Sequence, residues 1–157
     1  MPKKKSEPSG AALEARESGA AGGVVLDTHA LIWLLAGDSR LKKPVLSALE
    51  AAATAEGLFV AAISVWEIGM LEAKGRIAIA GGASAWVRRA LQLPGVQLAP
   101  LHPEIALSAA ALPDFHGDPA DRLIVATAIY LGFPLATADQ KIKAWGTKHK
   151  VGILGLG

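Results

Sequence analysis

The chain has 157 residues, of which 52% are hydrophobic and 19% charged, and its formal net charge is +2. This length and composition predict one globular domain with a single core and exclude a largely disordered protein. The chain contains no cysteine, which excludes disulfides, thiolate catalysis and cysteine-ligated metal sites. No apolar run approaches the roughly 20 residues that cross a bilayer, and no apolar signal core follows the basic N-terminus, so we expect a cytoplasmic protein without a membrane partner.

The first 23 residues differ in composition from the rest. They carry Lys3, Lys4 and Lys5, followed mainly by small and polar side chains. This composition is typical of a flexible leader, so we divide the chain into a leader over residues 1–23 and a folded domain over residues 24–157. The three lysines are either an electrostatic arm for RNA or, more simply, part of a solvated tail.

Beyond the leader, short apolar segments alternate with segments of helical character. The pattern predicts, in chain order, strand 24–26, helix 30–35, helix 44–55, strand 58–62, helix 64–74, helix 82–93, strand 96–98, helix 103–112, helix 118–131, strand 134–136, helix 138–145 and strand 151–154. Short buried strands that alternate with helices are typical of a parallel sheet covered on both faces. The expected fold class is therefore α/β with a central parallel sheet.

Four acidic residues fall where such a fold would bring them to one edge of its sheet. Asp27 ends the first strand, Glu67 lies in the first turn after the second strand, and Asp139 follows the fourth. Asp121 lies in the first turn of the helix at 118–131. In open α/β sheets, ligands bind outside the carboxyl ends of the strands, so we expect these acids to converge there.

Each acid also has a purely structural explanation. Asp27 suits a turn, and Ser64 and Glu67 have the spacing of a capping box. Asp121 and Asp139 stand in first helical turns, where the helix dipole favours negative charge. Together, however, four crowded carboxylates would raise one another's pKa, and a hard divalent cation removes that cost. A ligand set made only of oxygens predicts Mg²⁺ or Mn²⁺ rather than zinc, and such a site can carry out phosphoryl chemistry.

Four short motifs that contain these acids follow one another along the chain. They read VLDTHALIW at residues 25–33, ISVWEI at 63–68, HGDPADRLI at 116–124 and TAD at 137–139. In order and approximate spacing they resemble the motifs of PIN-domain proteins, especially the VapC-type toxins. Each motif alone is short, but four in order, with Asp-Pro-x-Asp-Arg among them, are a strong signal.

The resemblance implies a three-layer α/β/α sandwich with a central parallel sheet. It also implies four catalytic acids that hold one or two Mg²⁺ or Mn²⁺ ions: Asp27, Glu67, Asp121 and Asp139. Family members cut single-stranded or looped RNA, and VapC toxins are usually homodimers silenced by an antitoxin encoded beside them. The function we expect is a metal-dependent endoribonuclease, the toxin of a type II toxin–antitoxin pair. The alternative is a catalytically silent PIN fold that binds RNA or protein.

Several residues next to the acids could support the site. Thr28 and Thr137 could orient a carboxylate or a metal-bound water, or serve as turn and cap residues. Arg122 could meet a phosphate or form a salt bridge that orients a carboxylate. His29 and His116 are expected to form hydrogen bonds rather than to act as bases. Asp118 is expected to cap the helix that follows it.

The basic and aromatic residues have less specific patterns. Four basic side chains could form a rim that binds RNA phosphates, the alternative being solvated helix faces: Lys74, Arg76, Lys141 and Lys143. Four tryptophans lie in apolar contexts, which favours packing in the core or a dimer interface over base stacking: Trp33, Trp66, Trp86 and Trp145.

Overall fold

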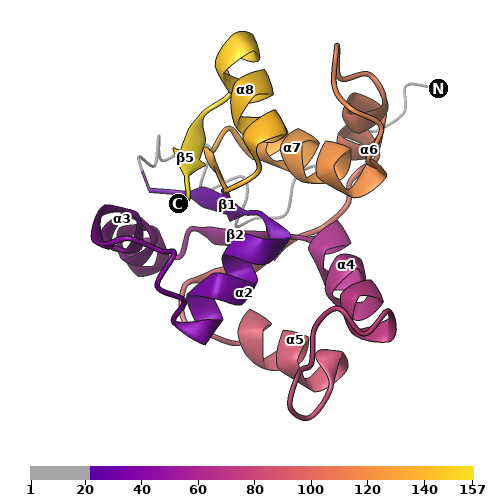
Figure 1. The fold of residues 1–157 in the computed structure, drawn as a ribbon. Coiled ribbons are helices and arrows are strands. Elements are labelled where there is room, and N and C mark those ends of the chain that lie inside the picture. Colours follow the sequence, from indigo (N-terminus) through magenta and orange to yellow (C-terminus); the bar gives the residue numbers. More distant parts are fainter. Residues whose placement is uncertain (1–21) are drawn as a thin grey trace, which may run out of the picture.

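The computed structural model describes residues 22–157, and every helix and strand expected beyond the leader is found there (Figure 1). The elements are β1 (Val24–Leu26), α2 (Thr28–Ala36), α3 (Lys43–Thr54), β2 (Leu58–Ala61), α4 (Ala62–Ala73), α5 (Ala83–Leu91), β3 (Val96–Ala99), α6 (Pro103–Ala110), α7 (Pro119–Leu131), β4 (Leu135–Thr137), α8 (Gln140–His149) and β5 (Ile153–Gly155). Apart from its last two residues, the predicted leader lies outside the described range. Within that range no helix has the length and apolar character needed to cross a bilayer.

The strands between residues 22 and 157 form one parallel sheet in the order β3-β2-β1-β4-β5. β1 lies at the centre, where Val25 pairs with Phe59 of β2 on one side and with Leu135 of β4 on the other. The chain adds β2 and β3 on one side of β1 and then β4 and β5 on the opposite side, so the strand order reverses next to β1. Ligands in open α/β sheets bind at such a reversal, outside the carboxyl ends of the strands.

Helices cover both faces of the sheet. Val25 of β1 packs into a core with Ile124 of α7 and Ile142 of α8, whereas the next residue, Leu26, packs with Leu31 of α2 in a second core. Successive strand residues enter opposite cores because side chains alternate between the faces of a sheet. Figure 1 shows α6, α7 and α8 on one side of the sheet and α2, α3, α4 and α5 on the other. The expected three-layer α/β/α sandwich is confirmed.

The predicted start of α4 was wrong. β2 ends at Ala61 and α4 begins at Ala62, two residues before the predicted start at Ser64. Alanine is the best helix former, so the helix begins at Ala62, although the apolar run of β2 continues through this residue. Ser64 therefore lies inside the helix, Glu67 stands in its second turn rather than its first, and the capping box does not form.

α7 and α8 each begin at an aspartate cap. Asp118 accepts hydrogen bonds from the amides of Ala120 at 2.9 Å and Asp121 at 3.2 Å, as its predicted capping role requires. Asp139 accepts from the amide of Ile142 at 3.0 Å, and α8 starts directly after it. The helix that was predicted to start at residue 138 therefore starts at Gln140, because Asp139 is its N-cap and does not lie in its first turn.

Candidate active site

The Asp27 carboxylate is buried at the end of β1. Its Oδ1 accepts from the amide of Thr28 at 2.7 Å, which caps α2, and its Oδ2 accepts from the Thr137 hydroxyl at 2.6 Å. The Nε2 atom of His29 accepts from the amide of Ala138 at 3.0 Å. A neutral ring then carries its proton on Nδ1, which lies 3.6 Å from Oδ2 of Asp27. Both carboxylate oxygens are therefore positioned by neighbouring donors.

Thr137 connects the ends of two neighbouring strands. Its hydroxyl donates to Asp27 and accepts from the amide of Asp139 at 3.1 Å, and the residue is fully buried. These two hydrogen bonds fix Asp27, after β1, relative to Asp139, after β4. Thr137 thus contacts a carboxylate and a main-chain amide, which are the contacts of the two alternatives that the sequence left open.

Glu67 reaches the same region from α4. Its Oε1 accepts from the Thr28 hydroxyl at 2.6 Å, and that hydroxyl lies 2.9 Å from the hydroxyl of the fully buried Ser64. Thr28 thus links the first turn of α2 to α4. Ser64 is a site residue that the sequence analysis missed. Its position three residues before Glu67, on the same side of the helix, was the available signal.

Asp121 approaches from the first turn of α7, in the opposite helical layer. Its Oδ2 lies 2.8 Å from Nε2 of His116, and its side chain is 20% exposed. His116 therefore has the hydrogen-bonding role that the sequence predicted for it. Because α4 and α7 cover opposite faces of the sheet, Glu67 and Asp121 come to the carboxyl edge from two sides.

The acids influence one another electrostatically. Burial raises the pKa of the Glu67 carboxyl, although the hydrogen bond that it accepts lowers it, and nearby negative charges raise it further. Those charges belong to Asp27, Asp121 and Asp118. Burial likewise raises the pKa of Asp121, and Asp118, Asp27 and Asp139 add to that effect. The four acids identified from the sequence therefore share one electrostatic environment, together with the cap residue Asp118.

The chemistry of this donor set suits a hard divalent cation. The four acids offer carboxylate oxygens, which Mg²⁺ and Mn²⁺ prefer, and a cation would relieve the mutual repulsion that adds to burial in raising the pKa values of Glu67 and Asp121. Between residues 22 and 157, no three His, Asp or Glu side chains already surround a common point. The carboxylates instead accept hydrogen bonds from the hydroxyl, imidazole and amide groups described above. The four acids therefore fit a divalent cation in their charge and in the type of ligand atom that they offer.

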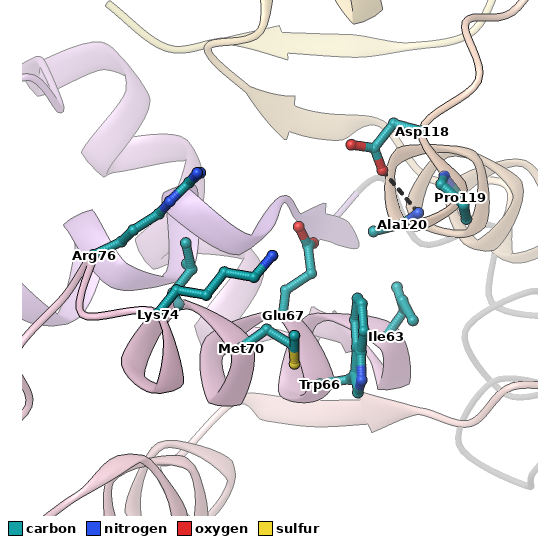
Figure 2. A pocket seen from close by; sticks show the side chains of 10 residues that line it. Ile63, Trp66, Glu67, Met70, Lys74, Arg76, Asp118, Pro119 and Ala120 are labelled. Atoms are coloured by element: carbon teal, nitrogen blue, oxygen red, sulfur yellow. Dashed lines mark hydrogen bonds between the residues drawn. The ribbon is translucent and has the colours of Figure 1, made fainter.

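A groove of about 480 Å³ opens beside Glu67, between α4 and the start of α7. Figure 2 shows the Glu67 carboxylate pointing from α4 into the space that Asp118 borders. Lys74 and Arg76, two of the predicted RNA-binding residues, also line this groove. Lys141 is exposed on α8, and Lys143 donates from Nζ to the main-chain carbonyl of Leu156 at 3.0 Å. The structure therefore brings two of the four basic residues to the groove that Glu67 and Asp118 line.

Arg122 supports the site through the main chain. Its guanidinium donates to the carbonyls of Ala109 at 3.0 Å, Phe115 at 2.8 Å and His116 at 2.9 Å. These hydrogen bonds go to main-chain oxygens, whereas the sequence analysis considered a phosphate or a carboxylate as its partner. Arg122 therefore holds the loop between α6 and α7, which carries His116 and leads into the helix of Asp121.

Solved structures of other proteins share this fold. The chain is similar to one in the crystal structure of VapBC2 from Rickettsia felis bound to a DNA fragment from their promoter, with a TM-score of 0.62 and 13% identity, over 85% of this chain and 98% of that one. It is also similar to a chain of a toxin–antitoxin complex from Klebsiella pneumoniae, with a TM-score of 0.53 and 22% identity, over 76% of this chain and 90% of that one. At these identities the likeness concerns the fold.

Sequence comparison identifies the family. Ribonuclease VapC22 from Mycobacterium tuberculosis (strain ATCC 25618 / H37Rv) is 38% identical over 122 residues, which are 77% of this chain and 90% of that protein. The family model described as PIN domain matches residues 24–147, from β1 into α8, and so contains all four acids. The chain belongs to the PIN-domain family.

Proposed function

We propose that this chain is a metal-dependent endoribonuclease and the toxin of a toxin–antitoxin pair. The observation that carries the proposal is that acids from both helical layers, near the point where the strand order reverses, raise one another's pKa in addition to the effect of burial. The proposed catalytic and metal-binding residues are Asp27, Glu67, Asp121 and Asp139. The 38% identity to a protein named as a ribonuclease supports RNA as the substrate.

The residues of this chain would prepare the site before substrate arrives. Mg²⁺ or Mn²⁺ held by the four acids would activate water and stabilise charge on the scissile phosphate. Asp27 is held by the Thr28 amide and the Thr137 hydroxyl, so its carboxylate need not reorganise. The Thr28 hydroxyl orients Glu67, and His116 orients Asp121, so residues of this chain position one acid from each helical layer.

The proposal extends to partners. We infer a cognate antitoxin, a homodimeric toxin and action in the cytoplasm, where RNA is present. The antitoxin is supported by the fold shared with a chain of the Klebsiella pneumoniae toxin–antitoxin complex. The alternative, a catalytically silent scaffold, gives no account of why half-buried and mutually repelling acids lie near one sheet edge.

We expect the purified protein to cleave labelled single-stranded RNA of random sequence at neutral pH when Mg²⁺ or Mn²⁺ is present. EDTA should reduce the rate to background, and excess metal should restore it, because the proposed ligands are carboxylates that need the cation for catalysis. Gel analysis of cleavage measures both effects. Asp121→Asn, purified in parallel, should be inactive, which also controls for contaminating nucleases.

Asp114→Asn is the matched control, because the Asp114 side chain is 68% exposed and pairs with Lys148 away from the acids. It should cleave like the wild type. Cleavage that survives complete chelation would exclude the metal-dependent mechanism. A well-folded protein that cleaves no RNA with either metal would favour the silent scaffold.

A further inference from the structure

The sequence predicted that the tryptophans pack either in the core or at a dimer interface. Trp66 does not lie in the core. Trp145 is 8% exposed and donates from its indole nitrogen to the Pro113 carbonyl at 2.7 Å. Trp66 is 57% exposed, although it adjoins the proposed catalytic residue Glu67 in the sequence. Burying a large aromatic side chain would stabilise the fold, so its exposure beside a proposed catalytic residue indicates a binding role.

The groove face of α4 combines apolar, acidic and basic side chains. Ile63, Glu67, Met70 and Lys74 follow at spacings of four, three and four residues, which places them on one side of the helix, and Trp66 lines the same groove. Figure 2 shows the Trp66 indole standing between Ile63 and Met70, while the Glu67 carboxylate extends into the groove. The indole therefore presents an apolar surface beside the acids.

The groove carries charges of both signs, and Figure 2 shows the Lys74 side chain extending toward the Glu67 carboxylate. Glu67 and Asp118 belong to the acidic cluster, whereas the exposed residues Lys74 and Arg76 follow the last residue of α4. A single-stranded nucleic acid alternates negatively charged phosphates with flat bases, so it needs both cations and aromatic faces. The groove's volume of about 480 Å³ is within the range of roughly 300–1,000 Å³ typical of ligand pockets.

We propose that Trp66 is a stacking platform for a nucleobase next to the scissile phosphate, and that Lys74 and Arg76 bind the phosphate that follows. The inference rests on the proposed ribonuclease function and assigns its substrate-binding side to this groove. The two basic residues that line the groove, and the presence of the proposed catalytic residue Glu67 in the same lining, favour RNA as the occupant. Trp66 would act in binding rather than in bond cleavage, because stacking is made equally with the substrate and the transition state.

Two substitutions distinguish the contribution of the aromatic ring of Trp66 from the contribution of its apolar volume. Trp66→Leu keeps an apolar side chain and loses the ring, whereas Trp66→Phe keeps a ring. In cleavage of single-stranded RNA, we expect Trp66→Leu to raise KM about ten- to a hundredfold with kcat little changed, and Trp66→Phe to retain most of the affinity. Leu107→Ala, at a 73% exposed position on α6, should behave like the wild type.

Binding without cleavage provides a second readout. Asp121→Asn protein, with Mg²⁺ present, should show quenched tryptophan fluorescence when a single-stranded oligonucleotide binds, and the added Trp66→Phe change should remove most of that quenching while affinity persists. Thermal melts establish that each variant is folded. Quenching that is unaffected by the loss of Trp66 would show that the base does not stack there.

The outcomes separate this inference from the proposed function. A wild-type protein that cleaves no RNA contradicts the ribonuclease proposal itself. A wild type that cleaves RNA, with an unchanged KM in Trp66→Leu, overturns only the stacking role. If Trp66→Leu leaves RNA affinity unchanged and instead weakens self-association in sedimentation, the groove is a protein interface and the inference is wrong.

Discussion

Glu67→Gln is expected to slow RNA cleavage at least about a hundredfold, while the metal-free protein remains at least as stable as the wild type. Glutamine keeps the length of the side chain and an oxygen that can accept from the Thr28 hydroxyl, 2.6 Å from the glutamate oxygen. It lacks the negative charge that a metal ligand supplies at this position. Shape and hydrogen bonding are thus preserved while the charge alone is removed.

The direction of the stability change follows from the pKa of Glu67. Folding raises this pKa, mainly through burial, so the folded state disfavours the charged carboxylate. A group of this kind contributes stability below its unfolded pKa, and that contribution is lost as the pH rises through its folded pKa. At neutral pH the wild type therefore carries an unfavourable charge in the absence of metal, and glutamine removes it.

Cleavage rates and thermal melts in EDTA test both parts of this prediction. Glu50→Gln, at an exposed position on α3, is the control and should change neither quantity. Near-wild-type cleavage by Glu67→Gln would remove Glu67 from the catalytic set. A metal-free melting temperature well below that of the wild type would contradict the repulsion inferred at this position.

Arg122→Met is expected to lower the free energy of unfolding by at least about 3 kcal/mol. The substitution leaves three main-chain carbonyls without their donors, those of Ala109, Phe115 and His116. A hydrogen bond from a charged group contributes roughly 1.5–3 kcal/mol, and solvent that reaches these carbonyls recovers part of the sum. Since this loop carries His116, cleavage should fall as well.

Urea unfolding gives the free energies for this comparison. Arg122→Lys should be intermediate, because an ammonium group cannot reach three carbonyls in the planar geometry of a guanidinium. Arg88→Met, at an exposed position on α5, should cost little. A loss below about 1 kcal/mol in Arg122→Met would mean that the loop does not depend on this side chain.

Most of the fold could be predicted because each element carries a local signal. β1 and β4 are short apolar runs, and Asp118 followed by proline marks the start of α7. The start of α4 could not be read in this way. Ala61 and Ala62 continue the apolar run of β2, so hydrophobicity alone does not show where strand becomes helix.

The acids were predictable, but the contacts that position them were not. The hydroxyl of Thr137 meets Asp27 across 110 residues, and that of Thr28 meets Glu67 across 39. Such contacts depend on which strands are neighbours and on the direction from which each helix leaves the sheet. The sequence therefore identifies the types of residue at the site, and the tertiary structure determines their partners.

The surface roles were the least predictable. The exposure of Trp66 depends on what packs against α4, and the partners of Arg122 depend on how the loop before α7 folds back. Neither is encoded in the neighbouring sequence, where Trp66 lies among apolar residues and Arg122 beside an acid. Local context favoured a tryptophan packed in the core or a dimer interface and a charge-paired arginine. The structure excludes the core for Trp66 and pairs Arg122 with main-chain carbonyls.

The rise in melting temperature on addition of Mn²⁺ tests most directly whether the acids share one metal site. Binding to the folded state alone stabilises it, by about 2.7 kcal/mol at a hundred times the Kd. We expect a clear shift for the wild type and for Asp114→Asn, and a much smaller shift for Asp27→Asn and Asp139→Asn. Asparagine keeps one oxygen that can cap the helix at both positions, but at Asp27 its amide nitrogen replaces the second acceptor, which contacts the Thr137 hydroxyl. Melts in EDTA therefore first establish that each variant is folded, and the loss of the Mn²⁺ shift is measured from that baseline. Equal shifts in all four proteins would contradict a shared metal site.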